Sequence, residues 1–224
     1  KALSDPSRQV RTEAIKALSL LMPLSTRVDP LIKELVSGAL GKNASVEGTA
    51  LTAVQTATLE ALTTVLEQGG SKAKLPASIP SALDAAKQLL TSPDEGIRES
   101  AAMVMGTSCS LLTPDVTEEI LAEILKSPES SFEARHGHAC AIRRILAGGA
   151  QVSAVEDLKK HVLNYLKDDK AAVREAGFAA LGATIGRAAN PTSSLRSSEA
   201  ELFKVMKNTQ EPMEIHRAVA RGLC

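Results

Sequence analysis

The chain has 224 residues, and its 26 lysines and arginines balance 26 aspartates and glutamates, so the formal net charge is zero. Hydrophobic residues make up 44% of the sequence but aromatic residues only 2%, with three Phe, one Tyr and no Trp. This composition excludes a single-strand nucleic-acid binder that stacks bases on aromatic rings, a DNA binder that relies on a basic surplus, and a disordered chain. We expect a folded protein with no direct sequence-specific contact to nucleic acid.

The cysteines indicate a reducing compartment. Cys109, Cys140 and Cys224 lie far apart in the sequence and cannot all pair with one another. This usage is typical of reduced thiols in a cytosolic or nuclear protein, where cysteine behaves as a small core residue. No run of 18 apolar residues occurs, so neither a membrane span nor a membrane partner is expected.

Apolar residues recur with the 3.6-residue period of a helix along the whole chain, which predicts an all-α protein. Pro30 and Pro114 stand at expected helix starts, where the missing N–H costs nothing. In residues 170–187 the apolar stripe is wide and made of small residues, which suits a helix packed on two sides. In chain order, helices are predicted over residues 8–22, 30–40, 49–68, 81–90, 114–126, 154–167, 170–187 and 197–207, with others opening near Ile97, Phe132 and Ile215.

A short turn followed by an apolar residue, an arginine and an Ala-rich helix recurs several times. The apolar anchors are Val10, Ile97, Phe132, Val173 and, in a fainter copy, Ile215. With one unit in the long gap, the mean period is roughly 40 residues, which is typical of HEAT and armadillo repeats. We therefore predict a right-handed α-solenoid of about six helix pairs.

The expected units are roughly 1–22, 29–68, 78–112, 114–148, 154–187 and 197–224, forming a single solenoid. Three longer polar connections, 41–48, 68–76 and 188–198, are expected on its edges, where insertions leave the core intact. Neither end carries an obvious polar capping repeat, so the chain is interpreted as a segment of a longer array. A thin core between neighbouring repeats also explains the shortage of large aromatic residues.

Charged residues recur at the start of the second helix of several units. Arg11, Arg98 and Arg174 lie one turn into that helix, and Asp5, Asp94 and Asp168 or Asp169 lie in the preceding turns. The preferred hypothesis is a structural ladder of Asp–Arg contacts that aligns repeats or caps helix N-termini. The alternative is that free arginines meet an acidic partner.

The most unusual stretch is residues 133–144. His136 and Cys140 share one helix face, but no further ligands complete a zinc site, so no metal is expected. Arg135, His136, Arg143 and Arg144 form a candidate basic surface for a partner. The alternative is that Arg135 belongs to the inter-repeat ladder, shifted by two residues.

No sequence motif for catalysis or cofactor binding is present. The chain lacks a Gly-x-Ser-x-Gly elbow, a P-loop and a Gly-x-Gly-x-x-Gly turn after a strand. We therefore expect no catalytic residues, no cofactor and no enzyme activity.

Two stretches resemble a known family. They are Pro23-Leu-Ser-Thr-Arg27 with Val28-Asp-Pro-Leu-Ile-Lys-Glu-Leu, and Phe132-Glu-Ala-Arg-His-Gly-His-Ala-Cys-Ala-Ile. Both are similar to the C-terminal part of the large HEAT-repeat translational activator of general amino-acid control, which activates the eukaryotic initiation factor 2 alpha kinase. The resemblance runs through the whole chain, but no functional residue of the family is carried over.

The resemblance implies a cytoplasmic, non-catalytic scaffold on translating or stalled ribosomes that acts in the response to amino-acid starvation. It implies contact with the kinase through the kinase's RWD domain, and with an ABC-F ATPase through other regions of a longer protein. The alternative is a HEAT-repeat adaptor of another pathway, such as a nuclear transport receptor or a phosphatase scaffold. Those receptors use acidic loops and aromatic pockets, and the sequence supplies little of either.

Overall fold

The computed structural model describes residues 2–24, 28–42, 47–69, 77–150, 152–153, 155–208 and 212–223, and every regular element in these ranges is helical. Short 3₁₀ helices, η1 (Ala2–Ser4) and η2 (Met22–Leu24), flank the first α-helix. The α-helices are α1 (Arg8–Leu21), α2 (Val28–Ala39), α3 (Gly48–Gly69), α4 (Ile79–Leu89), α5 (Glu95–Leu111), α6 (Pro114–Lys126), α7 (Phe132–Ala147), α8 (Val155–Tyr165), α9 (Ala171–Ile185), α10 (Pro191–Lys207) and α11 (Met213–Leu223).

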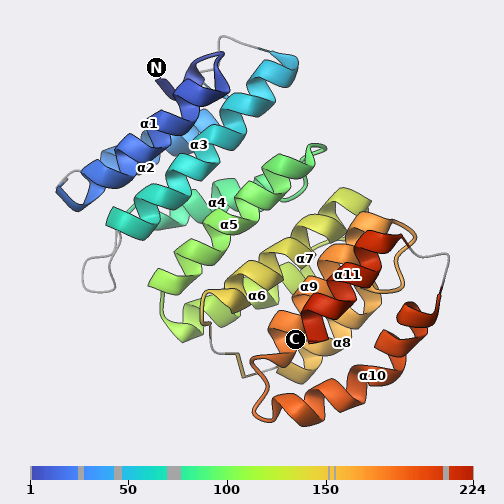
Figure 1. Ribbon diagram of the computed structural model, residues 1–224. Helices are drawn as coiled ribbons and strands as arrows, with labels where there is room; N and C mark the ends of the chain where they lie inside the picture. Colours follow the sequence, from blue (N-terminus) through green and yellow to red (C-terminus); the bar gives the residue numbers. More distant parts are fainter. Residues whose placement is uncertain are drawn as a thin grey trace.

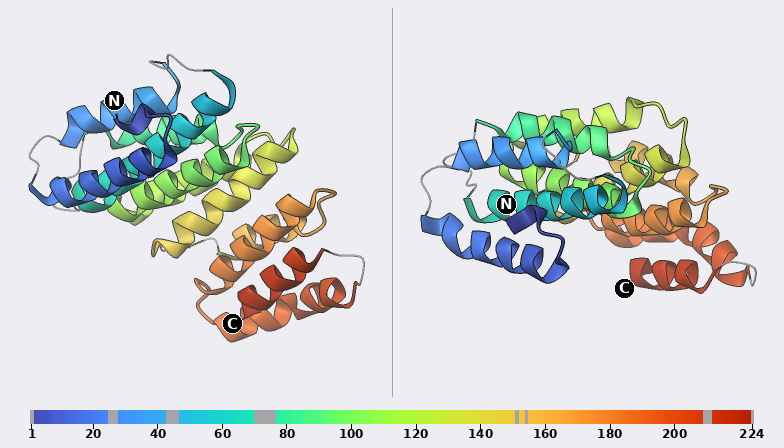
Figure 2. Two further views of the ribbon diagram at one scale, coloured as in Figure 1. Left: turned by 45° about the horizontal axis from the view of Figure 1, so that its top comes forward. Right: turned by 90° about the horizontal axis from the view of Figure 1, so that it is seen from above.

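The helices stack in two layers (Figures 1 and 2). In what we call the inner layer, α1, α3, α5, α7, α9 and α11 each contact the next. In the outer layer, α2, α4, α6 and α8 each pack on the inner helix that follows them in the chain. This confirms the predicted all-α, HEAT/armadillo-type fold.

Glycine stands where α7 closely approaches both the inner helix α5 and the end of the outer helix α4. A Cβ added to Gly106 of α5 would lie 2.7 Å from the backbone oxygen of Arg144 on α7. A Cβ on Gly137 of α7 would lie 2.0 Å from the backbone oxygen of Leu90, at the end of α4. Only a residue without a side chain allows these backbones to meet.

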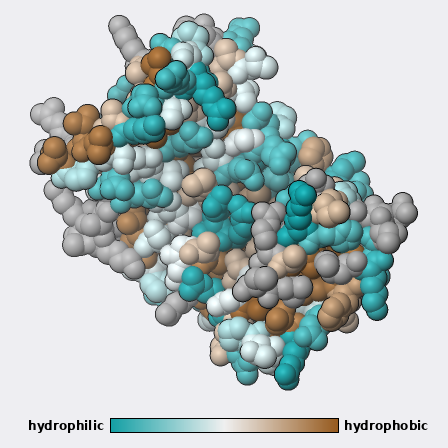
Figure 3. All heavy atoms as spheres, viewed as in Figure 1, coloured by the Kyte–Doolittle hydropathy of each residue, from teal (hydrophilic) through white to brown (hydrophobic). Residues whose placement is uncertain are grey.

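One hydrophobic cluster runs from Met22 to Val219 through both layers. It is filled mostly by Ala, Leu, Ile and Val, with Tyr165 and Phe178 as its fully buried aromatic residues. At the end of α1 and in η2, Leu20, Leu21 and Leu24 are exposed instead, and Figure 3 shows this apolar patch at the edge of the molecule.

The predicted helix bounds agree with most of the observed ones, and α6 begins and ends at the expected residues. The prediction for α10 was wrong, because residues 188–198 were assigned to a polar connection and the helix already begins at Pro191. Asn190 caps it, its side chain accepting the Ser193 N–H at 3.0 Å, and Pro191 supplies the preset first turn. Of the other connections, residues 43–46 and 70–76 lie outside the described ranges.

None of the helices described combines the length and the apolar character that crossing a bilayer requires.

Candidate functional site

Four arginines occupy the same position in the inner layer, as the fourth residue of α1, α5, α7 and α9. Each donates from Nη1 to backbone carbonyl oxygens five or six residues earlier, in the turn before its helix. Arg11 donates to the carbonyls of Asp5 at 2.7 Å and Pro6 at 2.9 Å, and Arg98 to those of Ser92 at 2.7 Å and Pro93 at 3.0 Å. Arg135 donates to the Glu129 carbonyl at 3.4 Å. Arg174 donates to the carbonyls of Asp168 at 2.8 Å and Asp169 at 3.2 Å. The guanidinium thus pairs with carbonyls of the turn itself, which lie beyond the last residue of the preceding helix.

This common position corrects the register expected for α7. Arg135 is not shifted by two residues, because it is equivalent to Arg98 and Arg174, and the residue equivalent to Ile97 is Ala134 rather than Phe132. Phe132 instead lies beside the guanidinium of Arg98, whose Cζ is 5.8 Å from the ring centroid. The error arose because an alanine carries little signal as an apolar anchor.

The aspartates of the expected ladder act mainly on the backbone of their own turns. Asp5 accepts the Ser7 N–H at 2.8 Å, and Asp94 caps α5 by accepting the Ile97 N–H at 2.9 Å. Asp168 accepts the Lys170 N–H at 2.9 Å. These contacts fix each turn before its helix begins.

A carboxylate–guanidinium contact between repeats is formed by Arg135 and Asp168. Nε and Nη2 of Arg135 both donate to the carboxylate, and Nη2 also lies 3.4 Å from Asp169. Burial acts to raise the pKa of Asp168, but the hydrogen bonds from Arg135 and from the Lys170 N–H, together with the Arg135 charge, outweigh it and leave that pKa below its ordinary value. The Asp168 side chain is 6% exposed and that of Arg135 is 25% exposed, so this ion pair is partly buried where α7 meets the turn before α9.

His136 is buried and does not belong to a basic surface, contrary to expectation. Its Nδ1 accepts a hydrogen bond from Nε of the buried Arg98 at 3.1 Å, and its side chain is 4% exposed. Burial, reinforced by the Arg98 charge, lowers the pKa of His136 from 6.5 to about 4. His136 is thus a neutral imidazole packed between α5 and α7, and it offers no charge to a partner.

The other members of the proposed basic surface differ in availability. Arg135 is engaged with Asp168, whereas Arg143 and Arg144 are half-buried on the later turns of α7. Arg144 lines a hollow of about 310 Å³ among α3, α5 and α7, together with Glu67, Met103 and Ser110. Of the four residues of the expected basic surface, Arg143 and Arg144 are the ones not taken up by contacts with Arg98 or Asp168.

Cys109 and Cys140 are buried and offer no reactive thiol, and Cys224 lies outside the described residues. Burial raises the pKa of Cys140 to about 12 and that of Cys109 to about 12. Cys140 Sγ lies 3.9 Å from His136, but within the described ranges no three His, Cys, Asp or Glu side chains are grouped to hold a metal ion.

Sequence reasoning missed a polar cluster around Glu129, in the turn between α6 and α7. Its carboxylate accepts the Tyr165 hydroxyl and lies 3.2 Å from His161 and 3.4 Å from His138. Burial opposes ionisation of Glu129, but these hydrogen bonds hold its pKa far below the ordinary value. The cluster links two consecutive repeats. Its only sequence signal is that His161 and Tyr165 share a helix face.

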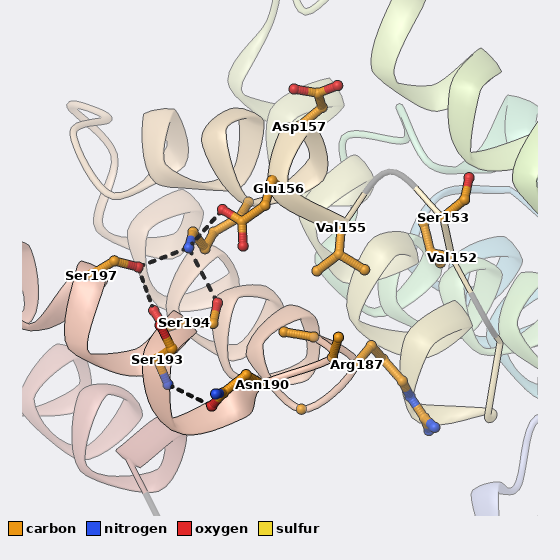
Figure 4. Close-up of a pocket in the computed structure, with 14 residues that line it drawn as sticks. Val152, Ser153, Val155, Glu156, Asp157, Arg187, Asn190, Ser193, Ser194 and Ser197 are labelled. Carbon is orange, nitrogen blue, oxygen red and sulfur yellow. Dashed lines mark hydrogen bonds and ion pairs between the residues drawn. The ribbon is translucent and has the colours of Figure 1, made fainter.

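A polar pocket of about 940 Å³ lies where α8, the end of α9 and the start of α10 meet (Figure 4). The Lys159 amine, on a side chain that is 8% exposed, donates to Ser197 at 2.9 Å and to Ser194 at 3.2 Å, and it pairs with Glu156 at 2.9 Å. Because these groups satisfy the amine, Lys159 ties α10 to α8, while the exposed Arg187 is a second cation that lines the pocket.

The two-layer stack, with an equivalent turn arginine in four of its inner helices, defines a HEAT/armadillo-type repeat protein. Residues 29–223 match the family described as stalled ribosome sensor GCN1-like, HEAT repeats. The chain belongs to this family.

Individual relatives are similar at modest identity. The chain is 30% identical over 187 residues to Protein ILITYHIA of Arabidopsis thaliana, covering 81% of this chain and 7% of the relative. It is 30% identical over 185 residues to eIF-2-alpha kinase activator GCN1 of Dictyostelium discoideum, covering 79% of this chain and 6% of the relative. It is 27% identical over 194 residues to stalled ribosome sensor GCN1 of Homo sapiens, covering 81% and 7%. The chain thus spans only a small part of the length of these relatives.

Among solved structures, the chain is similar to the designed armadillo repeat protein YIII(Dq)4CqI. The TM-score is 0.46 and the identity 17%, over 99% of this chain and 95% of that chain.

Proposed function

We propose that this chain is a non-catalytic scaffold segment of a ribosome-associated activator of the eukaryotic initiation factor 2 alpha kinase, acting in the response to amino-acid starvation and ribosome stalling. The family match over residues 29–223 carries the proposal. Relatives named as kinase activators or stalled ribosome sensors support it.

The site chemistry supports a scaffold rather than an enzyme. The conspicuous polar residues of α5 and α7 are used to join the repeats, because Arg98 is bonded to His136 and Arg135 to Asp168. The buried thiols are held in their protonated form. A stack of helices whose charged groups at these positions are used between repeats is suited to presenting its outer surfaces to partners.

The proposed partners are the ribosome and the RWD domain of the kinase, with an ABC-F ATPase bound through other regions of a longer protein. Within this chain we place the contact on Arg143 and Arg144. They remain on α7 after Arg135 and His136 are assigned to the interior. In this proposal the chain and its partners are located in the cytoplasm.

The test measures two bindings of the purified 224-residue chain: co-sedimentation with purified eukaryotic ribosomes and pull-down by the isolated RWD domain. We expect the wild-type chain to show at least one of these bindings. Arg196→Glu, a charge reversal on the exposed side of α10, should bind as wild type does. Arg143→Glu is expected to weaken it at least fivefold with unchanged helicity. Absence of both bindings, in this chain and in a longer one that contains it, would exclude the proposed role.

A further inference from the structure

The outer layer opens between α6 and α8. The inner helix α7 packs against α5 and α9, whereas α6 is held by α7, and α8 by α9 and α7. Both α6 and α8 pack on the inner layer. Between their facing sides lies a groove of about 420 Å³. A volume of this size accepts bulky side chains.

The floor of this groove and part of its walls are apolar. Leu121 of α6 and Leu158 of α8 form the buried floor, at 3% and 2% exposure. Ala122 and Leu125 continue the same face of α6, and Val152 lies on the opposite side. All three are half-buried, so part of this apolar surface faces solvent.

Every ionisable side chain that lines the groove is acidic. Glu118 is held by Ser153, which donates its backbone N–H and, at 3.1 Å, its hydroxyl. Asp115 lies in the first turn of α6, where the helix dipole accounts for a carboxylate. Glu119 lies beyond that turn and is exposed, and neither it nor Asp115 has an ion-pair partner among the described residues. Neither the helix dipole nor an ion pair among the described residues therefore accounts for Glu119.

We propose that this groove binds a segment of a partner protein that carries a bulky aliphatic side chain flanked by lysine or arginine. The aliphatic group would occupy the space above Leu121 and Leu158, and the cations would lie against Asp115 and Glu119. Charge complementarity sets the sign of the partner, since an acidic or neutral segment leaves these carboxylates unpaired. This surface lies on the outer layer, is separate from Arg143 and Arg144, and does not depend on binding to the ribosome or the kinase.

The probe is a fluorescein-labelled synthetic 12-residue amphipathic peptide of Lys, Leu and Ala, titrated with the full chain and followed by anisotropy. The wild-type chain is expected to bind this peptide at least tenfold more tightly than it binds either of two control peptides. In one control Glu replaces Lys, and in the other Ala replaces Leu. The double variant Asp115→Lys, Glu119→Lys is expected to lose at least tenfold in affinity. The double variant Glu60→Lys, Asp84→Lys changes the net charge equally at exposed positions outside the groove and is expected to bind as wild type does.

A second variant tests the apolar part without changing charge. Ala122→Trp fills the groove and is expected to abolish peptide binding, whereas Ala200→Trp on the exposed side of α10 leaves it unchanged. Circular dichroism confirms that each variant keeps the helicity of wild type. Equal weakening by both double charge variants would indicate non-specific attraction and overturn the proposal, as would binding that survives Ala122→Trp. Self-association of the chain that Ala122→Trp abolishes would assign the groove to a second copy and also overturn it.

Discussion

Arg135 connects two repeats through a single guanidinium, because it binds the carbonyl of its own turn and the carboxylate of the next one. Replacing it with alanine removes the charged side-chain donor of Asp168, a carboxylate that is 6% exposed in the wild-type fold. For Arg135→Ala we expect a loss of about 1–3 kcal/mol in the free energy of unfolding. Urea unfolding at pH 7 measures it.

Lys160→Ala is the control for that experiment. Lys160 pairs with Asp157 at 3.1 Å, but both side chains are 74% exposed, so the expected change is about 0.5 kcal/mol or less. Equal effects of the two substitutions would show that the Arg135 contact contributes no more than a surface pair.

His136 predicts a pH dependence of stability. Its pKa in the folded chain is about 4 and its ordinary value is 6.5, so between these values the unfolded chain binds more protons than the folded one. Stability therefore falls as the pH drops through this window, by about 2 kcal/mol between pH 7 and pH 5 from this residue alone. The contribution of Asp168, whose pKa is lowered, is lost only below about pH 4, so it does not contribute here.

The measurement compares urea unfolding of wild type and His136→Gln at pH 7 and pH 5. Glutamine keeps an acceptor for Arg98 but does not titrate. The variant should lose about 2 kcal/mol less than wild type over this interval. A loss equal to that of wild type would mean that other groups control the response.

At the scale of the helix, the crossing of α7 over the end of α4 depends on Gly137. Alanine is favoured over glycine inside a helix by up to about 1 kcal/mol. At Gly137, however, the added Cβ would lie 2.0 Å from the Leu90 carbonyl oxygen, so the two backbones must separate. We expect Gly137→Ala to lower the free energy of unfolding by about 1–3 kcal/mol, as measured by urea denaturation.

Gly186 provides the matched control, since its backbone has ordinary helical angles and a Cβ there would meet nothing closer than 3.6 Å. Gly186→Ala should be neutral or stabilising by up to about 1 kcal/mol. If Gly137→Ala behaves in the same way, close backbone approach is not what holds α7 against α4.

Helix positions were predictable wherever periodicity and terminal signals agreed. Pro114 at the first position and an apolar stripe defined α6 completely, while the serine-rich start of α10 concealed a helix that Asn190 and Pro191 begin. The site was less predictable, because sequence spacing shows which residues share a face but not which face is covered. His136 was therefore expected at the surface, and its contact with Arg98 depends on packing between two repeats.

At the scale of the whole molecule, each inner helix is supported by its neighbours along the stack, so a residue in the middle supports more structure than one near the end. Ile142 of α7 and Ile215 of α11 are equally buried, at 0% and 1% exposure, and permit a matched comparison. α7 packs between α5 and α9, whereas among the described helices α11 packs on α9 and α10. Ile142→Ala is expected to cost about 2–5 kcal/mol of global stability.

Hydrogen exchange measured by mass spectrometry distinguishes the two variants. Ile142→Ala should raise exchange in α5, α7 and α9 together. The lost apolar contacts and the cavity weaken the packing of α7 against both α5 and α9. Ile215→Ala should raise exchange in α10 and α11 and leave α3 and α5 as protected as in wild type, because nearest-neighbour coupling weakens along the stack. Uniform loss of protection in both variants would instead mean that the chain unfolds as one indivisible unit, with the stability of every helix limited by the whole rather than by its neighbours.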